Sequence, residues 1–247
     1  MTSAKIKWSL AAAGALAVFY LCLRHIVMVG KPVTFTDYFV LDVAFLPLQV
    51  FVVSVIIERL LHEREKRSML KKLNMVVGAF FGEAGNELLR RLTPLCAELD
   101  AMAADLVPGP RWDDHDFDAA IAAVGRLRCS LRPGPAQLDD LRRFLVANRL
   151  FILALLQNPN LLEHEAFTNL LWAVTHLTEE LTARDDFAAL PPTDLAHLGG
   201  DLDRAYKLLV REWLAYLRHL RTDYPYIYSL SLRTCPLQPQ ATAVISE

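Results

Sequence analysis

Histidine and carboxylate residues recur about one helical turn apart in two predicted helices. His176 is followed by Glu179 and Glu180, and Asp194 stands three residues before His197. Such pairs can bind a metal ion, but a di-iron bundle requires two E-x-x-H motifs and two more inward carboxylates. Asp194 is better explained by the first turn of a helix, where a negative charge is favourable. The sequence therefore predicts no metal ligands and no cofactor.

The other polar candidates favour structural roles over catalysis. The chain has no G-x-x-x-x-G-K-[ST] loop, no G-x-G-x-x-G loop and no G-x-S-x-G elbow. Asn148 and Arg149 interrupt the core face of a predicted helix, and a buried arginine needs a partner such as Glu83. We expect these three side chains to be buried and structural, and no catalytic residue is predicted.

Composition and charge exclude some classes of protein. Hydrophobic residues make up 53% of the 247 residues, and the net charge is −2. Nucleic-acid binding depends on dense positive charge, so no nucleic-acid partner is predicted. The chain has only 10 glycines and few stretches that alternate apolar with polar residues, which favours helix over sheet. Its four cysteines lie far apart without a C-x-x-C pair and are interpreted as reduced thiols.

Two apolar runs begin the chain and predict a transmembrane helical hairpin over residues 1–57. Its helices are expected at about 8–29 and 38–57, each near the roughly 20 residues that a bilayer core requires. Charged residues follow at once, yet the helical apolar stripe continues. A juxtamembrane helix over 58–92 is therefore expected to extend the second membrane helix.

Proline and glycine divide the rest of the chain into helices with short connections. The sequence predicts one cytoplasmic helical bundle over residues 93–233 and a flexible tail over 234–247. The expected breaks lie at 108–110, 133–135, 158–160 and 191–192. The predicted fold class is therefore all-α, with the N-terminal hairpin continuing into the cytoplasmic bundle.

The distribution of cations predicts the orientation of the hairpin. Lys5 and Lys7 precede the first run and many cations follow the second, whereas the connecting loop has only Lys31. The positive-inside rule therefore predicts an inner (plasma) membrane protein with both termini in the cytoplasm. The cations after the second run can contact anionic lipid headgroups. They are Arg59, Arg64, Lys66, Arg67, Lys71 and Lys72.

Arg24 and Asp42 interrupt the two apolar runs. They lie about equally far from the middle of the connecting loop, so an antiparallel hairpin would place them at the same depth. An ion pair there would satisfy two charges that are each costly in lipid. The alternative is that Arg24 reaches the outer interface while Asp42 lines a hydrated edge.

Two features predict contacts beyond the core. Gly78, Gly82 and Gly85 have the small-residue spacing that lets another helix approach closely, and they are expected to form a seam within the bundle or between two copies. Trp172 and His176 point away from the core face of their helix, and an outward tryptophan needs a second contact. The predicted partners are the bilayer, a second copy of the chain and an unknown protein.

Two stretches of the sequence resemble a known family. They are Gln157-Asn158-Pro159-Asn160-Leu161-Leu162-Glu163-His164-Glu165, running on to Leu170-Leu171-Trp172-Ala173-Val174, and Tyr224-Pro225-Tyr226 with Ser229-Leu230 and Arg233-Thr234. With the hairpin they are similar to an uncharacterised prokaryotic membrane-protein family that has an N-terminal two-helix hairpin and a C-terminal helical cytoplasmic domain. No activity is assigned to that family, so the resemblance implies architecture and carries over no site residue.

The favoured hypothesis is a membrane-anchored helical interaction module, such as a scaffold, adaptor or signal-coupling protein. Two alternatives remain open at this point. One is a small channel or transporter made of several hairpins. The other is a membrane-tethered enzyme whose pocket uses Glu83, Arg149, His176 or Glu212.

Overall fold

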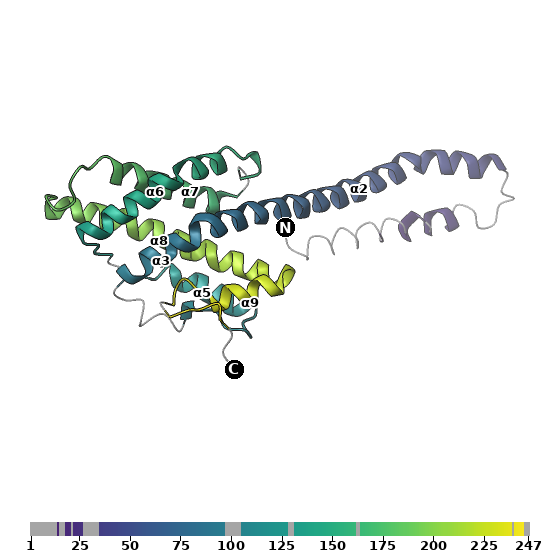
Figure 1. Cartoon of the computed structure of the whole chain (residues 1–247). Helices are drawn as coiled ribbons and strands as arrows, with labels where there is room; N and C mark the ends of the chain where they lie inside the picture. The colour runs from purple at the N-terminus through teal and green to yellow at the C-terminus, as the bar shows by residue number, and fades with distance from the viewer. Residues whose placement is uncertain are drawn as a thin grey trace. The chain divides into compact units, whose positions relative to one another are not determined.

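The computed structural model describes residues 14, 18–20, 22–26, 35–96, 105–127, 131–161, 164–238 and 240–244. Over these residues the chain consists of helices and their connections and contains no β-strand, as Figure 1 shows. The predicted all-α class is confirmed.

Two compact units make up the chain, Met1–Ser68 and Met69–Glu247. The long helix α2 (Phe35–Phe80) begins in the first unit and ends in the second. Glu, Arg, Lys and Leu dominate residues 58–67, and these good helix formers let α2 continue past the end of the apolar run. The sequence predicted boundaries at 57/58 and 92/93, whereas the two units meet inside the expected juxtamembrane segment.

The first unit contains helical residues at 18–20 and 22–26 and the first part of α2. Most of the first expected membrane helix lies outside the described residues, whereas residues 38–57 fall within α2. Among the residues that the structure describes, no helix is both long enough and apolar enough to cross a membrane.

The second unit is a helical bundle built around one long helix, α8 (Pro192–Asp223), which packs against α3, α5, α7 and α9 (Figure 1). The helix α6 packs on α7. A π-turn (Phe81–Gly85) joins α2 to α3, and a short 3-10 turn (Thr93–Leu95) follows α3. The remaining bounds are α3 (Asn86–Leu92), α5 (Asp114–Val124), α6 (Pro135–Leu156), a 3-10 turn (Pro159–Leu161), α7 (Glu165–Thr182) and α9 (Pro225–Arg233).

The core of the second unit follows the apolar stripe of α8. Tyr206 and Trp213 are at most 1% exposed and are the largest of the fully buried side chains. The stripe begins one turn later than its spacing suggests, because Leu195 is 37% exposed whereas Leu198 is buried. Phe80 and Phe81 bring the end of α2 into the same core.

The C-terminal segment and the cysteines correct two expectations. The predicted flexible tail is wrong for its first residues, because Cys235 and Leu237 are each 1% exposed in the core. Arg90 of α3 donates a hydrogen bond to the carbonyl oxygen of Thr234 at 3.4 Å, which also holds this segment. Cys96 is disulfide-bonded, so the expectation of four reduced thiols is wrong for it, whereas Cys22 and Cys235 are free.

Candidate functional site

Exposed apolar side chains cover the first part of α2. Their exposed fractions run from 41% for Ile56 to 66% for Phe51. All of them except Phe51 fall within an arc of about 140° around the helix, so they form one broad apolar face that would need to be covered by other apolar groups. The exposed apolar residues from 39 to 61 are Phe39, Val43, Leu46, Val50, Phe51, Val53, Ile56, Ile57, Leu60 and Leu61.

The predicted lipid-headgroup cations begin where this apolar surface ends. The side chains of Arg59, Arg64, Lys71 and Lys72 are exposed. Those of Lys66 and Arg67 lie outside the described residues. Headgroup binding stays a prediction.

The membrane ion pair also stays a prediction. Arg24 is half-buried, and the side chain of Asp42 lies outside the described residues.

The three glycines occupy three different environments. A Cβ at Gly78 would lie 3.2 Å from the Tyr216 hydroxyl, and one at Gly85 would lie 2.6 Å from the Phe81 ring. Gly82 is exposed and faces open space. A single seam within the bundle is therefore wrong, because the π-turn widens the helix at this point and rotates the glycines off a common face. A contact between two copies stays a prediction.

Two of the three side chains predicted to be buried are exposed. Arg149 lies on the outer side of α6, which packs mainly against one neighbour, α7, and therefore has a narrow buried stripe. Glu83 is exposed because Phe81, Ala84 and Gly85 take the buried side of the π-turn. Asn148 is half-buried, and its side-chain nitrogen donates to the carbonyl oxygen of Phe144 at 2.9 Å.

Trp172 and His176 point outward from α7, as their spacing indicates. The exposed fraction of Trp172 is 59%, and that of the His176 side chain is 45%. The surroundings of His176 are the more informative, because carboxylates from two helices approach its imidazole.

His176 and Glu180 of α7 meet His197 and Asp201 of α8. We call these four residues the α7–α8 cluster. His176 Nε2 lies 3.5 Å from Asp201 Oδ2 and 3.8 Å from Glu180 Oε1. His197 Nε2 lies 3.4 Å from the same Asp201 oxygen and 3.7 Å from Glu180 Oε2. Each helix contributes one histidine and one carboxylate four residues apart, so each pair lies on one face of its helix.

Arg184 fixes the carboxylates around the cluster. Its Nη1 donates to Glu180 Oε2 at 2.7 Å. Its Nε and Nη2 donate to the two carboxylate oxygens of Asp194 at 2.6 and 2.7 Å. These hydrogen bonds hold the pKa of both carboxyl groups below their usual range, so both are ionised near neutral pH. Asp194 is therefore a partner of Arg184, in addition to standing in the first turn of α8.

A second group of possible metal ligands, Asp113, His115 and Asp116, has a simpler explanation. All three are polar residues at the start of α5. Asp113 Oδ1 accepts hydrogen bonds from the backbone nitrogens of His115 and Asp116, at 2.8 and 3.1 Å. Asp116 in turn accepts from the Asp113 nitrogen, which completes a capping box. Helix capping accounts for this group.

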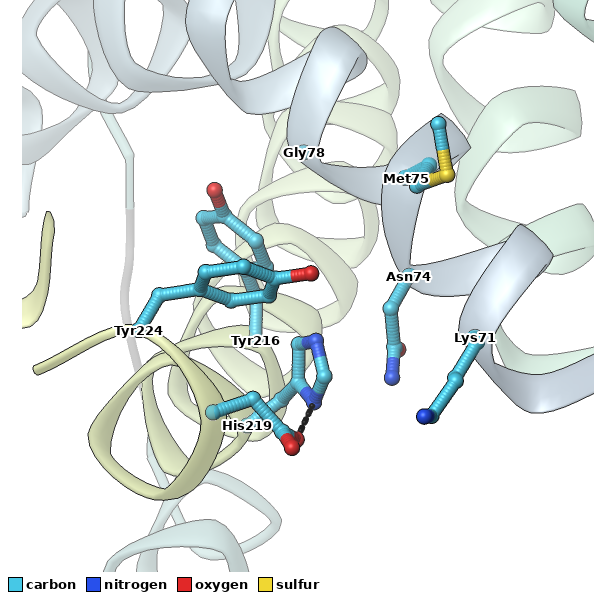
Figure 2. A pocket seen from close by; sticks show the side chains of 8 residues that line it. Lys71, Asn74, Met75, Gly78, Tyr216, His219 and Tyr224 are labelled. Carbon is cyan, nitrogen blue, oxygen red and sulfur yellow. Dashed lines mark ion pairs between the residues drawn. The ribbon is translucent and has the colours of Figure 1, made fainter. Parts of the chain in front are cut away.

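A polar groove of about 240 Å³ is formed by residues of α2, α8 and the start of α9 within the second unit. Figure 2 shows Tyr216, His219 and Tyr224 on one side, and Lys71, Asn74 and Gly78 on the other. His219 Nδ1 lies 2.8 Å from Asp223 Oδ2, and burial raises the pKa of Tyr216. The lysine, the amide and the hydroxyl groups can donate hydrogen bonds, whereas the Asp223 carboxylate can only accept them, so the lining offers both donors and acceptors.

Together these features define an all-helical protein with a buried core in one unit and exposed apolar side chains in the other. Residues 69–233 match the family model described as Uncharacterized protein MJ1433, C-terminal helical domain. Residues 4–61 match the model described as MJ1433, N-terminal helical domain. The chain belongs to the MJ1433 family. The two matches fall on either side of the division between the two compact units.

One relative supports this assignment across nearly the whole chain. It is the protein named Uncharacterized protein MJ1433 from Methanocaldococcus jannaschii, which is 41% identical over 220 residues. The match covers 89% of this chain and 88% of the relative. No solved structure matches the chain. The expected membership of an uncharacterised family is confirmed. The membrane character expected of that family is not supported by these matches or by the described helices.

Sequence reasoning found part of the α7–α8 cluster and missed its centre. It singled out His176 with Glu180, and His197 with Asp194, but it did not consider Asp201. The available signal was the spacing H-x-x-x-E in one helix and H-x-x-x-D in the next. That spacing becomes specific only when the two helices are known to pack against each other.

Proposed function

We propose that this protein is a membrane-anchored helical module whose first unit lies in a lipid bilayer and whose second unit acts through contacts with other proteins. The observation that carries the proposal is the row of exposed apolar side chains on α2 from Phe39 to Leu61. Exposed apolar patches of this extent mark contact with a membrane or a partner. No spanning helix is found among the described residues, so the proposal rests on these side chains and on the apolar sequence.

Lipid is the occupant that these observations favour. The apolar run of residues 38–57 has the length of a bilayer core, and a protein partner would not require that length. Charged residues begin at Glu58, as expected where a helix leaves the bilayer. In this proposal the protein resides in the inner (plasma) membrane with both termini in the cytoplasm. The exposed side chain of Trp172 motivates a protein partner, and self-association remains a further prediction.

The enzyme alternative has less support from the geometry. Of the residues it invoked, Glu83 and Arg149 are exposed, and Glu212 is buried in the core of the bundle. His176 belongs to the α7–α8 cluster, which contains none of the other three.

Membrane extraction of the full-length protein tests the proposal. Membranes are washed with alkaline carbonate and floated on a density gradient, and the wild-type protein is expected to float. The double variant Leu46→Arg, Val50→Arg places two charges in the proposed lipid-facing surface. It should lose about 5–7 kcal/mol of insertion free energy and leave the floating fraction.

A matched control has the same residue types and spacing in the second unit. Val146 and Leu150 lie four residues apart on α6 and are 47% and 82% exposed. The variant Val146→Arg, Leu150→Arg is expected to float like the wild type. Wild-type protein that carbonate releases, or a Leu46/Val50 variant that still floats, would contradict the proposal.

A further inference from the structure

The α7–α8 cluster places four potential ligand atoms close together from two packed helices. The two imidazole nitrogens His176 Nε2 and His197 Nε2 face the carboxylates of Glu180 and Asp201 at 3.4 to 3.8 Å. The ligand atoms of His176, Glu180 and Asp201 lie within 4.8 Å of one another. Donor atoms around one tetrahedral ion with bonds of about 2.1 Å are about 3.4 Å apart. His176, Glu180 and Asp201 are therefore close enough together to bind one small cation. His197 lies beside the same two carboxylates and could supply a fourth ligand.

Asp201 provides a second observation that points to a ligand at this cluster. Its side chain is 3% exposed, and its Oδ2 atom is buried without a hydrogen-bond partner. Arg204 lies near the other oxygen, at 3.3 Å from Oδ1. A buried carboxylate oxygen without a donor is costly, and such atoms are rare in folded proteins. This oxygen is the one that faces both imidazoles, so a cation between them would satisfy it.

We propose that His176, Glu180, His197 and Asp201 together bind one divalent transition-metal ion, and that Zn²⁺ fits them best. Two imidazole nitrogens favour zinc and its first-row neighbours over magnesium or calcium, which prefer oxygen ligands only. The two carboxylates balance the charge of the ion. Four protein ligands in a closed set are typical of structural zinc sites.

The surroundings of the cluster fit this role. Arg184 holds Glu180 through a charge-assisted hydrogen bond and is itself held by Asp194, so the ligand carboxylate is oriented from behind. The His176 and His197 side chains are 45% and 56% exposed, so an ion can enter from solvent. A bound ion would join the end of α7 to the start of α8 across the connection at 183–191.

Metal content of the untagged full-length protein in detergent tests the inference. The protein is stripped with a chelator, loaded with Zn²⁺, desalted and analysed by elemental mass spectrometry. We expect about one ion per chain, and Co²⁺ in its place should give the intense visible absorption of a tetrahedral site. Zinc at a hundredfold excess over Kd should raise Tm by about 5–10 °C, and a chelator should reverse the rise.

Variants locate the site. Asp201→Asn, His176→Gln and His197→Gln should each lose the bound ion and the rise in Tm. If circular dichroism shows that Asp201→Asn does not fold, the variants of the two exposed histidines still test the site. His219→Gln is the matched control, because His219 also has a carboxylate four residues away on α8 but no second pair. His115→Gln controls for the group at the start of α5.

The metal-binding test can fail or succeed independently of the membrane-extraction test. The proposed site lies entirely in the second unit, and its metal content is measured without a bilayer. Full metal content in the control variants and loss in the three cluster variants would support the site. Wild-type protein that retains no zinc or cobalt would overturn it. Cluster variants that retain as much metal as the controls would do the same.

Discussion

Glu212 is a buried acid at the centre of the bundle. It lies on α8 and is 4% exposed. Burial raises its pKa from the ordinary 4.5 to about 7, and the charge of Arg211 offsets this only in part. The folded protein therefore favours the neutral form of this carboxyl group more strongly than the unfolded chain does.

This difference predicts how stability depends on pH. The neutral carboxyl group of Glu212 contributes to the free energy of unfolding in full below pH 4.5. This contribution falls as the pH rises towards about 7 and is lost above that pH. At about 1.4 kcal/mol per pH unit, Glu212→Gln should be about 3–3.5 kcal/mol more stable than the wild type at pH 8 and nearly equal to it at pH 4.5. Urea unfolding of the detergent-solubilised protein at the two pH values measures this.

The control for this prediction is Glu179→Gln, at an exposed position on α7. This variant should show the same difference in free energy of unfolding between the two pH values as the wild type. If Glu212→Gln were more stable than the wild type by the same amount at both pH values, the gain in stability would not come from ionisation of Glu212.

Individual polar side chains were the hardest features to predict from the sequence. Spacing placed Arg149 near the core stripe of α6, but its burial depends on how many neighbours that helix has. Spacing also could not reveal Asp201, because its significance comes from His176 on another helix. The outward direction of Trp172 was predictable, since it follows from the apolar stripe of α7 alone.

At the scale of elements, the π-turn between α2 and α3 joins the end of α2 to the core. Phe80 contacts Phe167 of α7 edge to face, with ring centroids 5.4 Å apart. Phe81 stacks on Tyr216 of α8 at 5.3 Å. Both rings lie where a side chain on Gly85 would be, so the missing Cβ makes room for them.

Gly85→Ala and Gly82→Ala test this arrangement as a pair. A Cβ at Gly85 would lie 2.7 Å from the Phe80 ring, which is buried and cannot move freely, so we expect a loss of about 1–3 kcal/mol. Gly82 faces open space, and alanine there should gain up to about 1 kcal/mol from its higher helix propensity. Urea unfolding compares the two, and equal stability of both variants would contradict this role of Gly85.

The order of the helices followed from the sequence more closely than their contacts did. Proline and glycine mark the break before α6, and two prolines mark the break before α8. The π-turn was not predictable, because no residue type requires it. The sequence therefore could not predict that Gly78, Gly82 and Gly85 lie in different environments.

At the scale of the molecule, the two units differ in what surrounds their apolar side chains. The second unit buries them around Trp213 and Tyr206, whereas the first exposes them along α2. If the proposed hairpin spans a membrane, its cations predict a cytoplasmic second unit, whereas a disulfide such as that of Cys96 is more typical of oxidising compartments. These two signals therefore predict different compartments for the second unit.

Protease accessibility in intact cells tests membrane anchoring and orientation together. Epitope tags are placed before Thr2, between residues 31 and 34, where the sequence predicts the connecting loop, and after Glu247 of the full-length protein. The proposed hairpin predicts that external protease removes only the tag between residues 31 and 34 and that detergent makes all three tags accessible. Loss of the tag after Glu247 from intact cells, or recovery of the protein in the aqueous fraction, would contradict the cytoplasmic membrane-anchored module.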